Sequence, residues 1–200
     1  MHPIERLRYV ARAGSAPDRI LVAESVPAFS AFADNPGALL ISLRQLIVRQ
    51  PESPGLVVLG ARILSAIDPI DAAWAFVDEL ESDQTGYLTD ELAVDEAGGI
   101  EIIETLASRS GLLLCPPGAG SWIAEARGLG RSVAATTPLG SRLPKLLWEG
   151  FLERSTAGSV GAPLELIETD SVDELVGPDG VYDTASWSAD CSDVVELARF

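Results

Sequence analysis

Residues 111–136 read GLLLCPPGAGSWIAEARGLGRSVAAT, and the expected fold class follows from this stretch. It begins with a short apolar run, Leu112 to Cys115, between a glycine and a proline, which is typical of a buried strand. A turn rich in proline and glycine follows, then a helical pattern to about Leu129, then a second strand from Ser132 to Thr136. This alternation predicts a parallel sheet with crossover helices.

The same alternation extends on both sides of this stretch. Residues Leu143 to Arg154 have a helical pattern, and Leu164 to Ile167 form a third apolar run that predicts a strand. Upstream, the segment from Ile100 to Arg109 fits a further helix. We therefore expect an α/β domain with a reduced, Rossmann-like parallel sheet of three or four strands.

The N-terminal part of the chain is predicted to be helical. Asn35-Pro36, Ser53-Pro54 and Asp68-Pro69 each place a capping side chain before a proline, and proline loses nothing at a first helical position. Residues 81–99 are acidic and contain three glycines, which predicts a linker with one short helix. The expected domains are a helical domain over residues 1–85 and an α/β domain over residues 86–200.

Composition narrows the classes of function. Of the 200 residues, 47% are apolar, so the chain can form a substantial core. The net charge of -16 repels nucleic acids and anionic membrane surfaces, so neither is an expected partner. No apolar run is long enough for a membrane span. Two distant cysteines do not make a disulfide framework, and we expect a cytoplasmic protein.

The turn after the first strand is one candidate for anion binding. Gly118, Gly120 and Ser121 precede a helix, and backbone amides at a helix N-terminus favour a phosphate or carboxylate. The full glycine patterns of nucleotide-binding loops are absent. A tight strand-to-helix turn that needs glycine explains these residues as well, and the incomplete pattern favours that explanation.

A second candidate follows the next strand. Its residues are hydroxyls and cations in an otherwise acidic chain: Thr136, Thr137, Ser141, Arg142 and Lys145. Hydroxyls and cations together can hold a phosphate. The alternative is that Arg142 and Lys145 are ordinary solvated charges at the start of a helix. If the two strands are neighbours, both loops lie at one edge of the sheet, where α/β proteins place ligands.

The cysteine and the acidic segment are interpreted as structural, without a catalytic or metal-binding role. Cys115 stands at the end of a strand, but no histidine is near it in sequence, and free cysteine is among the most buried residue types. The acidic residues between Glu79 and Glu96 lack the spacing of a calcium loop and are interpreted as a solvated linker. We therefore predict no catalytic residue, no metal site and no cofactor.

Three stretches resemble one known family. They are Arg49 to Leu56 (RQPESPGL), Val133 to Ser141 (VAATTPLGS) and Glu168 to Val195, which has GVYD at 180–183. They are similar to the family segments "RPTSVNL", "VAAPxS" and the tail where "GV" precedes "NPAFDVTP". The family is the initiation factor 2B alpha/beta/delta type, which includes the methylthioribose-1-phosphate and ribose-1,5-bisphosphate isomerases.

The resemblance implies a function as well as a fold. Family isomerases use a cysteine in a "THCNTG"-like loop and an aspartate in a "GAD…NGD…NKIGT" segment. This chain has no counterpart of the first and reads GLLLCPPGAGS where the second should lie. We therefore expect a non-catalytic relative that binds a small phosphorylated ligand or a partner chain, in a regulatory or assembly role. The alternative is an altered sugar-phosphate aldose–ketose isomerase. Because family members pair through their C-terminal domains, the implied state is a homodimer.

Overall fold

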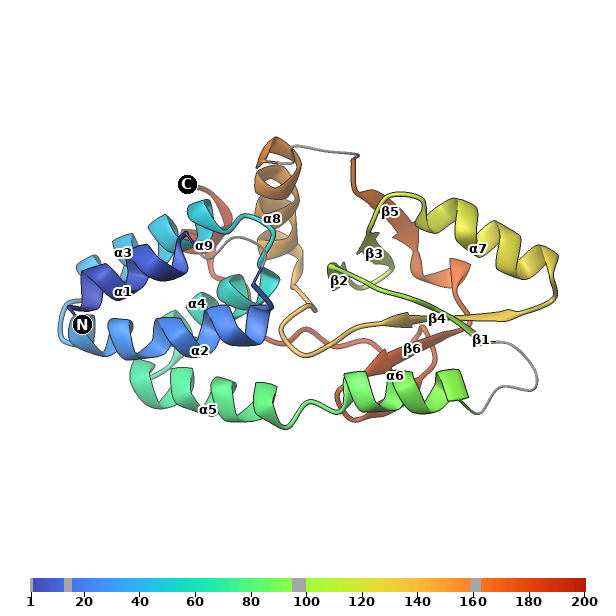
Figure 1. Ribbon diagram of the computed structural model, residues 1–200. Coiled ribbons are helices and arrows are strands. Elements are labelled where there is room, and N and C mark those ends of the chain that lie inside the picture. Colours follow the sequence, from blue (N-terminus) through green and yellow to red (C-terminus); the bar gives the residue numbers. More distant parts are fainter. Residues whose placement is uncertain (1, 13–15, 95–99, 159–162) are drawn as a thin grey trace.

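A helical layer lies beside a strand-rich part in this computed structural model (Figure 1). The structure describes residues 2–12, 16–94, 100–158 and 163–200. The helices are α1 (Pro3–Val10), α2 (Asp18–Phe29), α3 (Pro36–Arg49), α4 (Pro54–Ser65), α5 (Pro69–Glu81), α6 (Thr85–Val94), α7 (Ala119–Gly128), α8 (Lys145–Gly158) and α9 (Val195–Ala198), with 3-10 turns η1 (Ser30–Phe32) and η2 (Thr169–Ser171). Within the described residues, no helix combines the length and apolar character that crossing a membrane requires.

The predicted helix starts at three prolines are confirmed. The side-chain oxygens of Asn35, Ser53 and Asp68 accept hydrogen bonds of 3.0 to 3.3 Å from backbone amides in the first turns of α3, α4 and α5. Each cap satisfies amides that have no partner within the helix. These starts divide the N-terminal part into short helices that can pack around one another.

Helix α4 lies at the centre of the helical layer. Nearly every residue of its first three turns is buried, and the sequence there is apolar on all sides. Helices α2, α3, α5, α8 and α9 all contact α4. The resulting core therefore includes Leu147 and Phe151 of α8 and Leu197 of α9, which come from the far end of the chain.

The larger sheet confirms the expected α/β class. It has the strand order β1-β4-β6-β7, where β1 is Ile100–Ile103, β4 is Ser132–Thr136, β6 is Glu174–Gly177 and β7 is Gly180–Tyr182. Strands β1, β4 and β6 are parallel, whereas β7 turns back antiparallel to β6. Strands β6 (ELVG) and β7 (GVY) were missed in the sequence because neither contains an apolar run like that of Leu112 to Cys115.

The prediction that all three apolar runs share one parallel sheet is wrong. Strands β3 (Leu112–Cys115) and β5 (Glu165–Glu168) belong to a separate sheet with β2 (Ala107–Arg109), in the order β2-β3-β5, and both pairings are antiparallel. Only two residues, Ser110 and Gly111, connect β2 to β3. Gly111 has φ 83°, the left-handed conformation that such a hairpin needs, so the chain reverses there.

The prediction of a helix over residues 100–109 is also wrong. The segment forms β1 and β2 instead, separated by a short bend. Three of the four residues of β1 are isoleucines, and branched side chains pack well on a pleated sheet. Strand β1 pairs along its whole length with β4, so a partner that lies 32 residues away in sequence overrides the local pattern.

The acidic segment from Glu81 onward contains the expected short helix, α6; residues 95–99 lie outside the described residues. A second apolar core joins α7 to strands of both sheets, including Ile123, Val133 and Leu175. The boundary between two domains at residue 85 stays a prediction.

Candidate functional site

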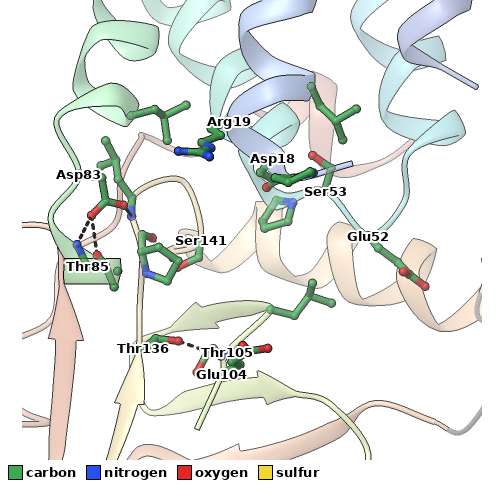
Figure 2. A pocket seen from close by; sticks show the side chains of 18 of the residues that line it. Asp18, Arg19, Glu52, Ser53, Asp83, Thr85, Glu104, Thr105, Thr136 and Ser141 are labelled. Carbon is green, nitrogen blue, oxygen red and sulfur yellow. Dashed lines mark hydrogen bonds between the residues drawn. The ribbon is translucent and has the colours of Figure 1, made fainter. Parts of the chain in front are cut away.

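A cleft of about 1000 Å³ separates the helical layer from the carboxyl ends of β1 and β4 (Figure 2). The start of α2 and the loop before α4 form one wall. The segment between α5 and α6 and the residues that follow β1 and β4 form the other walls. Clefts at the carboxyl ends of parallel strands are the preferred ligand sites of α/β folds, so this cleft is the candidate site.

The polar lining of the cleft is mainly acidic. The carboxylates are Asp18, Glu52, Asp83, Asp90 and Glu104, and among the described lining residues Arg19 is the one cation. Such an excess of negative charge repels a phosphate group.

Asp18 occupies the N-terminus of α4. Its Oδ2 accepts a hydrogen bond of 2.6 Å from the amide of Gly55, in the first turn of that helix. A helix N-terminus attracts anions, and here the chain supplies its own. Burial raises the pKa of Asp18 to about 6, although hydrogen bonds from Ser53 and Gly55 act in the opposite direction.

Asp83 connects two walls of the cleft. Its Oδ1 accepts hydrogen bonds from the amide of Thr85 at 2.8 Å and from the Thr85 hydroxyl at 2.5 Å (Figure 2). Its Oδ2 accepts a bond of 2.9 Å from the amide of Leu139, in the loop after β4. The carboxylate therefore holds the start of α6 against this loop.

Two of the predicted anion-binding residues, Thr136 and Ser141, line the cleft. Both hydroxyls already have partners within the chain. The Thr136 hydroxyl donates to the carbonyl of Ile103 at 3.3 Å, and the Ser141 hydroxyl donates to the carbonyl of Pro138 at 2.6 Å. Each hydroxyl can still accept one further hydrogen bond from a ligand.

Thr137 and Arg142 belong to an internal polar network. The Thr137 hydroxyl lies 2.6 Å from the Tyr182 hydroxyl, and Thr137 is fully buried. The Arg142 guanidinium contacts Oδ1 of Asp190 through Nη2 at 2.6 Å and Nε at 2.9 Å. Burial opposes the charge of Arg142, but Asp190 and Tyr182 outweigh it and raise the pKa of the guanidinium.

The predicted joint site required the turn before α7 to lie beside the loop after β4. The structure does not place the two strands that lead into these loops next to each other. Gly118 and Gly120 follow β3 of the antiparallel sheet, whereas β4 belongs to the other sheet. Their amides donate to the two carboxylate oxygens of Glu165, at 2.7 and 2.8 Å. Ser121 is exposed on α7 and Lys145 is exposed at the start of α8. Anion binding by these residues stays a prediction.

Cys115 lies in the interior, as the sequence suggested. Its side chain is fully buried, and burial raises the pKa of the thiol to about 11; a hydrogen bond from Thr105 lowers it slightly and Glu165 raises it. A protonated, inaccessible thiol is a poor nucleophile. Among the described residues, no group of three or more His, Cys, Asp or Glu side chains is placed to hold a metal ion.

Sequence reasoning missed the carboxylates that organise this region. The carboxylates of Asp18, Asp83 and Asp190 each accept a hydrogen bond from a backbone amide between 37 and 56 positions away. Asp83 and Asp190 each stand in acidic or irregular stretches that looked like solvated surface. One signal was present: Pro17-Asp18 stands at the start of α2, but it resembles an ordinary helix start.

No protein-family model matches this chain, and no curated protein matches it. Among solved structures, it is similar to eIF2B beta from Chaetomium thermophilum, with 11% identity, a TM-score of 0.64, and coverage of 91% of this chain and 88% of that chain. It is also similar to a chain of the tetrameric eIF2B-beta2-delta2 complex from C. thermophilum, with 12% identity, a TM-score of 0.63, and coverage of 91% and 90%. The chain therefore has the fold of the eIF2B beta subunit, as the resemblance in its sequence predicted.

Proposed function

We propose that this chain is a non-catalytic regulatory or assembly subunit, which acts by binding a partner chain and a small molecule. The observation that carries the proposal is the pairing of Arg142 with Asp190. The cation that the sequence offers for substrate binding is instead held inside the chain, 12% exposed at its side chain. It joins the loop after β4 to the C-terminal segment and is not free for chemistry.

The state of the other reactive groups supports this proposal. Cys115 is buried with a raised pKa, and Glu165 occupies the amides of Gly118 and Gly120. Asp83 is engaged at both carboxylate oxygens. These groups maintain the architecture around the cleft, which leaves the cleft itself as a place where a molecule can bind.

Similarity to a chain of a tetrameric eIF2B-beta2-delta2 complex supports a partner chain. The proposal includes a homodimer that forms through the C-terminal part and works in the cytoplasm. At one edge of the larger sheet, β7 exposes 41% of Val181, and at one edge of the smaller sheet β5 exposes 50% of Leu166. Unpaired strand edges with exposed apolar side chains are suited to pairing between chains.

The charge of the cleft restricts the kind of small molecule that it can bind. A phosphorylated ligand would meet Arg19 as the one cation in the described lining of the cleft, against five carboxylates. The cleft therefore suits a neutral polyhydroxyl compound or a cation better than it suits a phosphate. The phosphorylated ligand that the sequence suggested stays a prediction.

Two measurements on the purified full chain test the proposal. Sedimentation equilibrium over a series of concentrations should give the mass of a dimer. A thermal-shift screen should find stabilisation by at least one polyol, amine or sugar phosphate, because a ligand that binds the folded state raises the melting temperature. A monomer at every concentration, together with no shift by any compound, would overturn it.

One observation favours the isomerase alternative. Asp18 lies in the cleft with a pKa near 6, and acids tuned toward neutral pH serve as general acids and bases. Incubation with methylthioribose 1-phosphate and ribose 1,5-bisphosphate, followed by product analysis, separates the two functions. We expect no turnover; turnover that disappears in Asp18→Asn would establish the alternative.

A further inference from the structure

A second hollow, of about 650 Å³, is lined by residues of α1 and α3. Unlike the acidic cleft, it is lined by cations. We call it the basic groove. Its lining is Ile4, Leu7, Arg8, Ala11, Arg12, Phe32, Ser42, Arg44, Gln45, Leu46, Val48, Arg49 and Phe200. Four of these residues are arginines, and none of the described lining residues is acidic. In a chain with a net charge of -16, such a local excess of cations needs an explanation.

The arginines of the basic groove are only lightly engaged within the chain. Arg8 pairs with Glu5, but both side chains are more than half exposed, and such surface pairs contribute little. Arg12 and Arg49 form no ion pair with any of the described residues. Their charges are therefore available to an outside anion.

Arg44 is held in place without losing its charge. Its Nε donates to the carbonyl of Glu196 at 2.8 Å, and its guanidinium lies 5.2 Å from the centre of the Phe200 ring. The two contacting groups, a backbone carbonyl and an aromatic ring, are both uncharged. Arg44 is thus a positioned cation beside Phe200 in the lining of the basic groove, and positioning reduces the entropy lost when a ligand binds.

The cations stand on both sides of the basic groove. Arg8 and Arg12 lie four residues apart on the α1 side, and Arg44 and Arg49 lie five residues apart on the α3 side. At 1.5 Å per helical residue, Arg44 and Arg49 are separated by about 7.5 Å along α3. Residues of both helices line the same hollow. Four cations on two sides of the hollow match several carboxylates along a chain better than they match a single head group.

Apolar surface lies between these cations. Leu7, Ala11 and Leu46 form part of the wall, and Ile4 and Val48 are 44% and 53% exposed. An apolar floor between two helices is the usual receptor for one face of a third helix. The combination of apolar floor and cationic rims complements a helix with leucine-like side chains on one face and carboxylates beside them.

We propose that the basic groove binds an acidic amphipathic peptide segment of the partner chain. This inference rests on the proposed function, since it names the surface and the chemistry of one contact with the partner. The apolar side chains of the segment lie on Ile4, Val48 and Phe200, and its carboxylates pair with the arginines on either rim.

The probe for this site is a fluorescein-labelled helical peptide built of leucine and glutamate, with leucine at helical spacing. Fluorescence anisotropy with the full chain should show binding that weakens as salt is added. The same peptide with lysine in place of glutamate should bind about tenfold more weakly or worse, because like charges oppose it. Absence of binding by the glutamate peptide, or equal binding of the two peptides, would overturn the proposal.

A pair of charge-matched variants locates the contact. Arg12→Glu combined with Arg49→Glu should weaken binding of the glutamate peptide by about tenfold or more. Arg19→Glu combined with Arg127→Glu changes the net charge equally at exposed sites outside the basic groove and should retain most of the affinity. Unchanged thermal melting shows that both variants fold. Equal loss in both would mean that only overall charge matters, and the proposed site would be wrong.

If the variant with Arg12→Glu and Arg49→Glu does not fold, the conservative variant Arg12→Lys with Arg49→Lys is measured instead. It keeps the charge and should keep most of the affinity. Sedimentation of the same proteins separates this inference from the proposed function. If the protein is a dimer but does not bind the glutamate peptide, only the proposed peptide site is wrong. If it is a monomer that binds the peptide, only the proposed homodimer is wrong.

Discussion

Asp190 and Arg142, 48 residues apart in sequence, form an ion pair in which both side chains are largely removed from solvent, with exposures of 1% and 12%. The second oxygen of Asp190 accepts hydrogen bonds from the amides of Gly140 and Arg142, at 2.8 and 3.0 Å. In turn, the Asp190 amide donates to the Arg142 carbonyl at 2.9 Å, and the Asp190 carbonyl accepts from Arg62. A single residue thus joins the loop after β4, helix α4 and the C-terminal segment.

Removal of the carboxylate should destabilise the protein strongly. Asp190→Ala leaves the Arg142 charge buried without a partner, and we expect a loss of about 3–5 kcal/mol in the free energy of unfolding, measured by urea denaturation. Changing Arg142 to Met in the same protein removes the orphaned charge and should restore part of this loss. If the free energy of unfolding of Asp190→Ala alone lies within about 1 kcal/mol of the wild-type value, the pair does not hold the loop.

Stability should depend on the ionisation of Asp18. Burial raises the pKa of this carboxyl from 3.8 to about 6, so the folded state holds the proton more tightly than the unfolded state. The corresponding stability is fully present below about pH 4 and is lost as the pH rises through about 6, a difference of up to about 3 kcal/mol.

The variant Asp18→Asn isolates this effect. Asparagine keeps an oxygen that can accept the hydrogen bond from Gly55 but carries no charge. Above pH 7 it should be more stable than the wild type, and the advantage should vanish below pH 4 in denaturation experiments across this range. Asp34→Asn, at an exposed position, serves as the control. Identical pH profiles for the two variants would contradict the assignment.

Gly150 marks the contact of α8 with α9. A Cβ at this position would overlap the carbonyl group of Ala198, with the carbonyl carbon at 2.9 Å, and neither backbone can move away cheaply. Gly150→Ala should therefore release α9 from the helical core and lower the melting temperature. Gly128→Ala, in α7, meets nothing within 4 Å and should be neutral or stabilise by about 1 kcal/mol. Equal melting temperatures for the two variants would be inconsistent with the close approach.

The turn before α7 should respond to acid through Glu165. Hydrogen bonds from the amides of Gly120 and Gly118 lower the pKa of this carboxyl. The stabilisation is therefore present above its ordinary pKa of 4.5 and is lost as the pH falls through the lower, folded-state value. Glu165→Gln should melt below the wild type at pH 7, and the gap should close in acid.

A matched change on the same strand controls for charge in this experiment. Glu168 is exposed in β5, and Glu168→Gln should melt like the wild type at pH 7. A gap between Glu165→Gln and the wild type that stays constant down to pH 2 would mean that the amides do not select the ionised carboxyl.

Local patterns predicted much of this architecture, and they did so where the determining contacts are local. The caps at Asn35, Ser53 and Asp68 bond within three residues of themselves. The run from Leu112 to Cys115 is apolar enough to be a buried strand in any sheet. For the same reason, the strand β4 and helices α7 and α8 were placed correctly by their own residues.

The misassigned elements are those that depend on distant partners. Residues 100–109 carry a pattern compatible with a helix, and pairing of β1 with β4 decides otherwise. The direction of β3 depends on the left-handed conformation of Gly111, which the Ser110-Gly111 pair could have signalled. Strand β5 then pairs with β3 rather than joining the larger sheet, because β3 has already turned away.

The candidate site shows the same division. From its sequence alone, this chain could be recognised as acidic, helical at the start and α/β thereafter, with a fold like that of initiation factor 2B. The sequence also indicated which residues can bind an anion in principle. Whether Arg142 or the amides of Gly118 and Gly120 are free to do so depends on Asp190 and Glu165, which lie more than forty residues away. Folding brings Asp190 to Arg142 because a buried charge must be paired, and it brings Glu165 to amides that have no partner within their own turn. Both contacts join distant parts of the chain, so they depend on the tertiary structure and cannot be inferred from local sequence.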